Sequence, residues 1–189
     1  MMAKKYQPIL NLPNVITIAR IALVPVIIWA LFVGDFLMGF VLFSLAGFSD
    51  FFDGWLARLQ KTQTSFGAYL DPVADKLLMA STYIMLGLLG HIPIWLILLV
   101  ISRDLLIIIG VAMARWMGKN IHIKPLMVSK LNTLLQICLV ILVLADLAFM
   151  LNLDVVRSIA YIATAAINIA SALAYLYLWV TTILKQPVD

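Results

Sequence analysis

Four aspartates lie between residues 50 and 75 of a chain that has only 9 acidic residues and no glutamate. They form two pairs, Asp50 with Asp53 and Asp71 with Asp75. On a helix, spacings of three and four residues put both members of a pair on one face. Carboxylates gathered from two helices repel one another unless a cation lies between them. Oxygen ligands without His or Cys favour magnesium or manganese over zinc. The spacing therefore predicts a metal site of the kind that serves phosphate chemistry.

The alternative is that each aspartate separately caps a helix or faces water. The neighbouring residues argue against it, because Gly54, Ala57 and Arg58 follow the first pair and Gly67 precedes the second. The whole stretch reads Asp-x2-Asp-Gly-x2-Ala-Arg-x8-Gly-x3-Asp-x3-Asp. This pattern resembles the signature of the CDP-alcohol phosphotransferases at every fixed position.

The resemblance implies a membrane enzyme that takes CDP-diacylglycerol, moves its phosphatidyl group onto an acceptor hydroxyl and releases CMP. It implies two Mg²⁺ or Mn²⁺ ions held by the four aspartates, with Asp71 and Asp75 catalytic and Asp75 also the base. It further implies that a second set of residues binds CDP, and that the protein is a homodimer without a nucleic-acid partner. The residues of the CDP set are Asp50, Asp53, Gly54, Ala57, Arg58 and Gly67.

Composition places these residues in a membrane. Hydrophobic residues make up 65% of the chain and charged residues only 12%, far from the balance of a soluble domain. Apolar stretches of about 20 residues, the length that spans a bilayer, recur along the chain. We predict an all-α integral membrane protein with one domain over 1–189, six transmembrane helices, an N-terminal interfacial segment and a polar active cavity. The predicted spans are 12–33, 36–56, 68–90, 93–116, 126–150 and 155–184.

The loop charges predict an orientation. With six spans both termini lie on one side, and the cations of that side outnumber Arg157, which stands alone on the other. By the positive-inside rule, the termini and the aspartate site face the cytoplasm. Because no transit peptide precedes the first span, we expect the bacterial inner membrane. The cations on the cytoplasmic side are Lys4, Lys5, Arg58, Lys61, Arg115, Lys119, Lys124, Lys130 and Lys185.

Other polar residues interrupt the apolar spans. Asn14, Thr17 and Arg20 share one face of the first span, where they either line the active cavity or cap and anchor the helix end. Arg103 and Asp104 form a charged pair inside the fourth span that is either structural or a phosphate contact. Resemblance to the family assigns five residues to binding the acceptor or its phosphate, namely Asn14, Thr17, Arg20, Arg103 and Lys130.

The signature does not identify the acceptor alcohol. Family members that use glycerol-3-phosphate usually carry Glu after the arginine of the fourth span and a second arginine eight positions beyond it, where this chain has Asp104 and Val111. The resemblance therefore favours phosphatidylglycerol as acceptor, giving cardiolipin, over glycerol-3-phosphate, giving phosphatidylglycerophosphate. A cation transporter is a distant alternative, because acids in spans also mark ion pathways. The clustering of the acids at one entrance argues against it.

Overall fold

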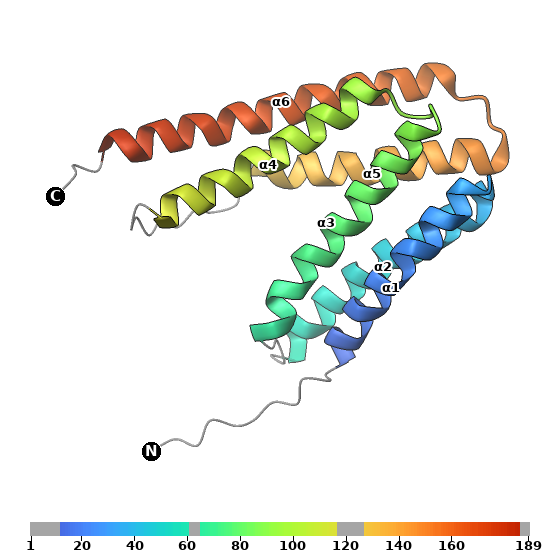
Figure 1. The fold of residues 1–189 in the computed structure, drawn as a ribbon, viewed down its shortest axis with the longest axis horizontal. Helices are drawn as coiled ribbons and strands as arrows, with labels where there is room; N and C mark the ends of the chain where they lie inside the picture. Colours follow the sequence, from blue (N-terminus) through green and yellow to red (C-terminus); the bar gives the residue numbers. More distant parts are fainter. Residues whose placement is uncertain (1–11, 61–64, 117–126, 186–189) are drawn as a thin grey trace. The chain divides into compact units, whose positions relative to one another are not determined.

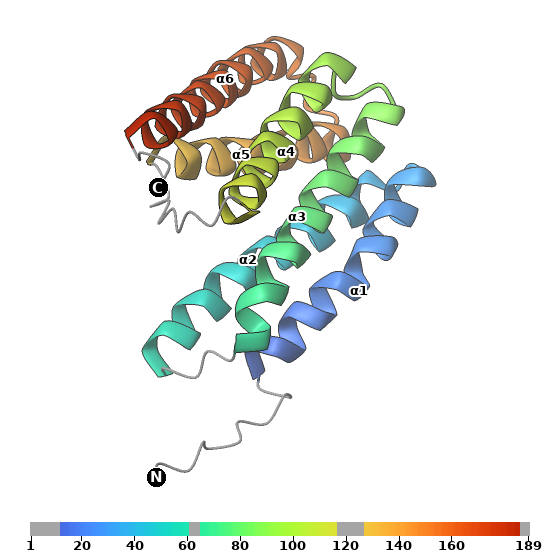
Figure 2. The same ribbon diagram turned by 60° about the vertical axis from the view of Figure 1, so that its left-hand side comes forward.

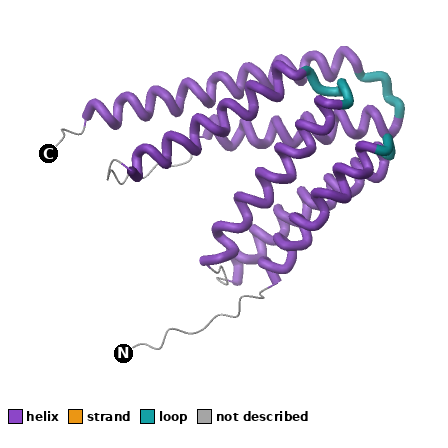
Figure 3. Tube along the Cα trace, viewed as in Figure 1, coloured by secondary structure: helices purple, strands orange, loops and turns teal. Residues whose placement is uncertain are grey.

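The computed structural model of the chain describes residues 12–60, 65–116 and 127–185. Within these ranges every regular element is a helix (Figure 3), and each predicted span coincides with one of them. Of the helical residues, 12–15, 50–60, 65–70, 114–115 and 182–185 are described by their backbone alone. The predicted interfacial segment, which precedes residue 12, lies outside the described residues. The helices are α1 (Leu12–Phe32), α2 (Phe36–Gln60), α3 (Ser65–Leu88), α4 (Ile94–Trp116), α5 (Met127–Phe149) and α6 (Asp154–Lys185).

Three helices contain stretches long and apolar enough to cross a membrane, namely Ile94–Met113, Met127–Phe149 and Asp154–Thr181. The described parts of α1 and α2 contain shorter apolar segments, Ile16–Phe32 and Phe36–Ser49. The first half of α3 carries Asp71, Asp75 and Lys76, which reduce its hydropathy. The helical content and the three long apolar helices are those of a membrane protein, whereas six spans stay a prediction.

The chain forms two compact units, of which the first extends to Leu89 and includes Leu144–Leu151. In this unit α1 packs against both α2 and α3 (Figures 1 and 2). Its core contains buried side chains from all three helices, and Phe40 meets Phe149 edge to face with ring centroids 5.6 Å apart. These core residues include Ile27, Leu31, Phe43, Leu78 and Leu86.

The α1–α2 connection is a tight turn with a defined cap. Gly34 has φ +82°, a left-handed conformation that glycine adopts without a Cβ penalty at a helix C-terminus. Asp35 then caps α2, since its Oδ1 accepts a hydrogen bond of 2.9 Å from the backbone N–H of Met38. The turn therefore directs α2 back along α1.

The second unit comprises Gly90–Val143 and the chain from Asn152 onward. Here α4 packs along α6. The hydroxyl of Tyr161 on α6 donates to the backbone carbonyl of His91, at 2.6 Å, in the turn before α4. Burial, and after it the positive charge of Arg157, lower the pKa of the His91 imidazole. Further along the pair, a Cβ built on Gly110 would lie only 1.0 Å from Cζ2 of Trp179. Glycine at 110 therefore permits the α4–α6 contact.

We predict that Gly110→Ala destabilises the protein, because the added methyl group displaces the Trp179 indole from α4. Overpacking of this kind costs about 1–3 kcal/mol. The matched control is Gly47→Ala, which adds the same group to α2 where no atom lies within 4 Å. Thermal unfolding in detergent, followed by size-exclusion chromatography, should show a lower midpoint for Gly110→Ala and an unchanged or higher one for Gly47→Ala. Equal midpoints for the two variants would contradict this packing.

Candidate functional site

The last two aspartates of the signature are held by α1. Asp71 and Asp75 lie one turn apart on α3, and Thr17 and Arg20 lie one turn apart on α1. The Thr17 hydroxyl donates a hydrogen bond to Oδ1 of Asp71, and Nη1 of Arg20 lies 2.8 Å from Oδ1 of Asp75. Two polar pairs in register thus fasten α1 to α3.

Burial differs sharply between the two sides of this contact. The Arg20 side chain is 2% exposed, whereas that of Asp75 is 44% exposed. Asp71 is half-buried and Thr17 is buried. Thr17 and Arg20 therefore lie inside the unit as supports, and the carboxylates that they hold lie at its surface. This arrangement holds two anionic groups at the surface while a buried cation compensates part of their charge.

The other residues predicted for this site have side chains outside the described part of the structure. Asn14 is placed as a helical residue of α1, and the first half of the signature lies on α2. Asp50, Asp53, Gly54, Ala57, Arg58 and Gly67 thus have described helical backbones only. Among the described side chains no group of three or more His, Cys, Asp or Glu could hold a metal ion. The four-carboxylate cluster therefore stays a prediction.

The two described carboxylates nevertheless fit the predicted metals. Both present hard oxygen donors, and magnesium and manganese prefer such ligands. A carboxylate has two oxygens with about four lone-pair sites, so a hydrogen bond or ion pair on Oδ1 of Asp71 or Asp75 is compatible with coordination. The donor set of α3 is therefore compatible with the predicted magnesium or manganese.

A second polar cluster surrounds Arg103 in the other unit. Arg103 is buried, and its Nη1 lies 2.7 Å from Oδ1 of Asp104, which confirms the predicted pair. Its Nη2 donates to Ser129 of α5 at 2.6 Å and to Ser171 of α6 at 2.7 Å. The guanidinium also lies 5.8 Å from the centre of the Tyr175 ring, within cation–π distance. Arg103 therefore joins three helices.

Sequence reasoning missed part of this cluster. Ser171 and Tyr175 are not among the site residues predicted from the sequence, yet both contact the buried guanidinium of Arg103. The sequence did indicate a shared polar face. Ser171 and Tyr175 lie four residues apart and Asn168 lies three before Ser171, which puts them on one face of α6. Lys130, predicted to contact an anion, has an exposed side chain beside Ser129 on α5.

Comparison with known proteins supports the resemblance to the CDP-alcohol phosphotransferases. The family model for CDP-alcohol phosphatidyltransferase matches residues 10–184. Cardiolipin synthase (CMP-forming) of Rattus norvegicus is 34% identical over 181 residues, which cover 87% of this chain and 60% of the relative. A probable phosphatidylglycerophosphate synthase of Mycobacterium tuberculosis is 38% identical over 125 residues, covering 59% of this chain and 60% of the relative.

A third relative is the CDP-diacylglycerol--glycerol-3-phosphate 3-phosphatidyltransferase of Rickettsia felis. It is 45% identical over 100 residues, which cover 51% of this chain and 55% of the relative. The chain thus matches 60% or less of the length of these three relatives. Because the family model matches nearly the whole chain and includes both described carboxylates, the chain belongs to the CDP-alcohol phosphatidyltransferase family.

Proposed function

We propose that the protein is a metal-dependent phosphatidyltransferase of phospholipid biosynthesis. It would transfer the phosphatidyl group of CDP-diacylglycerol to an acceptor hydroxyl and release CMP. The observation that carries this proposal is the pairing of Thr17 with Asp71 and of Arg20 with Asp75. That pairing places the last two signature carboxylates side by side at the surface of the first unit.

In this proposal Asp71 and Asp75 hold the metal together with Asp50 and Asp53. Bound divalent cations would neutralise the pyrophosphate charge of the donor. Arg58 adds a fixed cation for the same phosphates, and the small residues of the signature, Gly54, Ala57 and Gly67, leave room for the nucleotide. Asn14 is assigned to the same cavity.

Asp75 is proposed as the base. The acceptor hydroxyl oxygen forms a bond to the lipid-linked phosphorus while the bond from that phosphorus to the CMP oxygen breaks, and the hydroxyl proton passes to the Asp75 carboxylate. The Arg20 guanidinium at 2.8 Å keeps this carboxylate in place. Thr17 does the same for Asp71, so we assign Thr17 and Arg20 as positioning residues for these aspartates.

For the acceptor we propose phosphatidylglycerol, which would make the product cardiolipin. The match to the rat cardiolipin synthase covers 87% of this chain, whereas the matches to the two glycerophosphate-type relatives cover 59% and 51%. Arg103 and Lys130 are proposed contacts of the acceptor phosphate. Glycerol-3-phosphate is the second candidate, because the two glycerophosphate-type relatives have a higher sequence identity to this chain over their shorter matches.

The membrane location, orientation and oligomeric state of the enzyme are also proposals. The apolar helices and the family support an integral membrane protein. The distribution of lysine and arginine supports an aspartate site that opens to the cytoplasm of a bacterial inner membrane. A homodimer rests on resemblance to the family.

Asp71→Asn and Asp75→Asn should each lower CMP release by about 100-fold or more, since each removes a carboxylate charge from the reacting centre. The matched control is Asp35→Asn. Asp35 belongs to the same unit but caps α2 through Met38, and asparagine caps helices equally well. Initial rates are measured on protein that elutes as a single peak in detergent. Near-normal CMP release by either α3 variant would refute the assignment.

The acceptor is tested by offering phosphatidylglycerol or glycerol-3-phosphate separately with CDP-diacylglycerol in detergent micelles. Each reaction contains magnesium, manganese or EDTA, and both CMP and the lipid product are measured. We expect cardiolipin with phosphatidylglycerol, little product with glycerol-3-phosphate, and none with EDTA. Phosphatidylglycerophosphate formed only from glycerol-3-phosphate would reverse the choice of acceptor. Full activity in EDTA would contradict the proposed dependence on a metal ion.

A further inference from the structure

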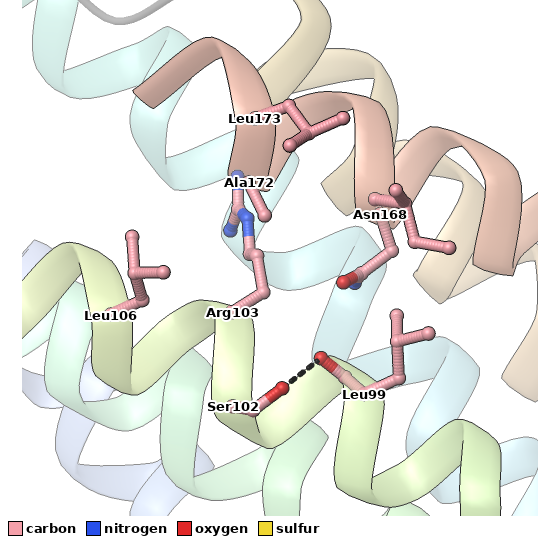
Figure 4. Close-up of a pocket in the computed structure, with 8 residues that line it drawn as sticks. Leu99, Ser102, Arg103, Leu106, Asn168, Ala172 and Leu173 are labelled. Carbon is pink, nitrogen blue, oxygen red and sulfur yellow. Dashed lines mark hydrogen bonds between the residues drawn. The ribbon is translucent and has the colours of Figure 1, made fainter. Parts of the chain in front are cut away.

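A pocket of about 190 Å³ lies between α4 and α6 of the second unit. Figure 4 shows the side chains that line it, which repeat at helical spacing on both helices. Most are apolar, but Arg103 of α4 and Asn168 of α6 both point into the space between the helices (Figure 4). The lining consists of Leu99, Ser102, Arg103, Leu106, Asn168, Ile169, Ala172 and Leu173.

Asn168 is the unusual member of this lining. Its side chain is fully buried, and neither its carboxamide oxygen nor its nitrogen has a hydrogen-bond partner among the described residues. Leaving both atoms unsatisfied in a membrane helix would cost several kcal/mol. A carboxamide both donates and accepts, so the group that completes it should do both as well. A hydroxyl has this property.

Arg103 brings a guanidinium to the pocket, with the Asp104 carboxylate as its counter-charge. Its Nε donates to Ser171, its Nη2 donates to both Ser129 and Ser171, and its Nη1 donates to Asp104. A guanidinium has five N–H donors, two of them on Nη1. Within the described part of the chain, one Nη1 donor is therefore left for a ligand. An anionic phosphate oxygen is the acceptor that suits it best.

The remaining walls are mostly apolar, and two of their residues on α6 are exposed. Ile169 is 48% exposed and Leu173 is 60% exposed, and both lie in the part of α6 that is apolar enough to span a membrane. Acyl chains would contact such side chains in a bilayer. A ligand that joins an acyl chain, a phosphate and a hydroxyl would thus meet a suitable surface at each of its parts.

We propose that this pocket binds the glycerol phosphate headgroup of a lipid, with the phosphate on Arg103 and a glycerol hydroxyl on Asn168. Asn168 is then a specificity-determining residue for the acceptor, and in this respect the inference rests on the proposed function. Free glycerol-3-phosphate carries the same glycerol phosphate. The apolar walls favour the lipid form.

The test compares two short-chain lipids that share the phosphate diester and acyl chains. Phosphatidylglycerol carries the hydroxyls, and phosphatidylethanol lacks them. Binding is measured as ligand-dependent thermal stabilisation in detergent, without CDP-diacylglycerol. The wild-type protein should bind phosphatidylglycerol about tenfold more tightly, a factor typical of one buried hydrogen bond to a neutral group. Asn168→Leu should remove this preference.

Asn132→Leu is the matched control. Asn132 on α5 is also fully buried, with both carboxamide atoms unpartnered among the described residues, but it does not line the pocket. The control should keep the tenfold preference. If Asn168→Leu does not elute as a single peak, Asn168→Ala replaces it, since alanine removes the amide without adding a branched side chain.

The proposal is overturned if the wild-type protein shows no preference, if Asn168→Leu keeps it, or if Asn132→Leu loses it equally. A parallel pair, glycerol-3-phosphate and ethyl phosphate, tests the source of the ligand. If Asn168 is needed for a preference between these two soluble phosphates but not for one between the two lipids, the lipid assignment is overturned. CMP release is measured separately. Its absence with every acceptor would refute the proposed function while leaving the binding result to decide the role of Asn168.

Discussion

The ion pair between Arg20 and Asp75 is the interaction on which the rest of the first unit depends. A guanidinium that is 2% exposed within an apolar helix would be very costly without a partner. Its pairing with Asp75 fixes which face of α1 meets α3. Once that face is fixed, Thr17 one turn earlier meets Asp71 one turn earlier. The orientation of both carboxylates thus follows from the need to neutralise one buried cation.

The second unit also contains a buried cation, but most of the partners of that cation are neutral. Arg103 is as buried as a core residue, and its charge is met by one carboxylate, two serine hydroxyls and a tyrosine ring. Hydroxyls satisfy the donors of a guanidinium without cancelling its charge. Asp104 balances the charge of Arg103, and the second N–H donor of Nη1, which has no acceptor among the described residues, is what an anionic ligand could use. The carboxamide of Asn168 beside Arg103, unpartnered among the described residues, then adds a neutral polar group to the α4–α6 pocket.

Much of the fold was predictable from the sequence, because apolar runs of membrane length have few alternatives to a helix. All six runs became helices. The bounds differ most where α2 continues to Gln60 and α3 begins at Ser65, because the polar sequence of the signature region gives no apolar boundary there. The shared face of Thr17 and Arg20 was also predictable, since it depends only on helical periodicity.

The partners of these polar residues were not predictable, because periodicity does not tell how one helix is rotated against another. Resemblance to the family assigned Thr17 and Arg20 to the acceptor, which stays a prediction, but it did not indicate that they pair with Asp71 and Asp75. Ser171 and Tyr175 were not predicted as site residues, because small and aromatic residues at this spacing are common at helix contacts in membranes. Only the tertiary structure shows that a cation lies opposite them.

The most direct test of the account is a double-mutant cycle on the pair that fixes α1 against α3. Thermal stability in detergent would be measured for Arg20→Gln, for Asp75→Asn and for the two changes combined. If the ion pair holds the helices, the double variant loses less stability than the sum of the single losses, with a coupling of about 1 kcal/mol or more. Strictly additive losses would contradict the account, since they would mean that the two residues contribute independently.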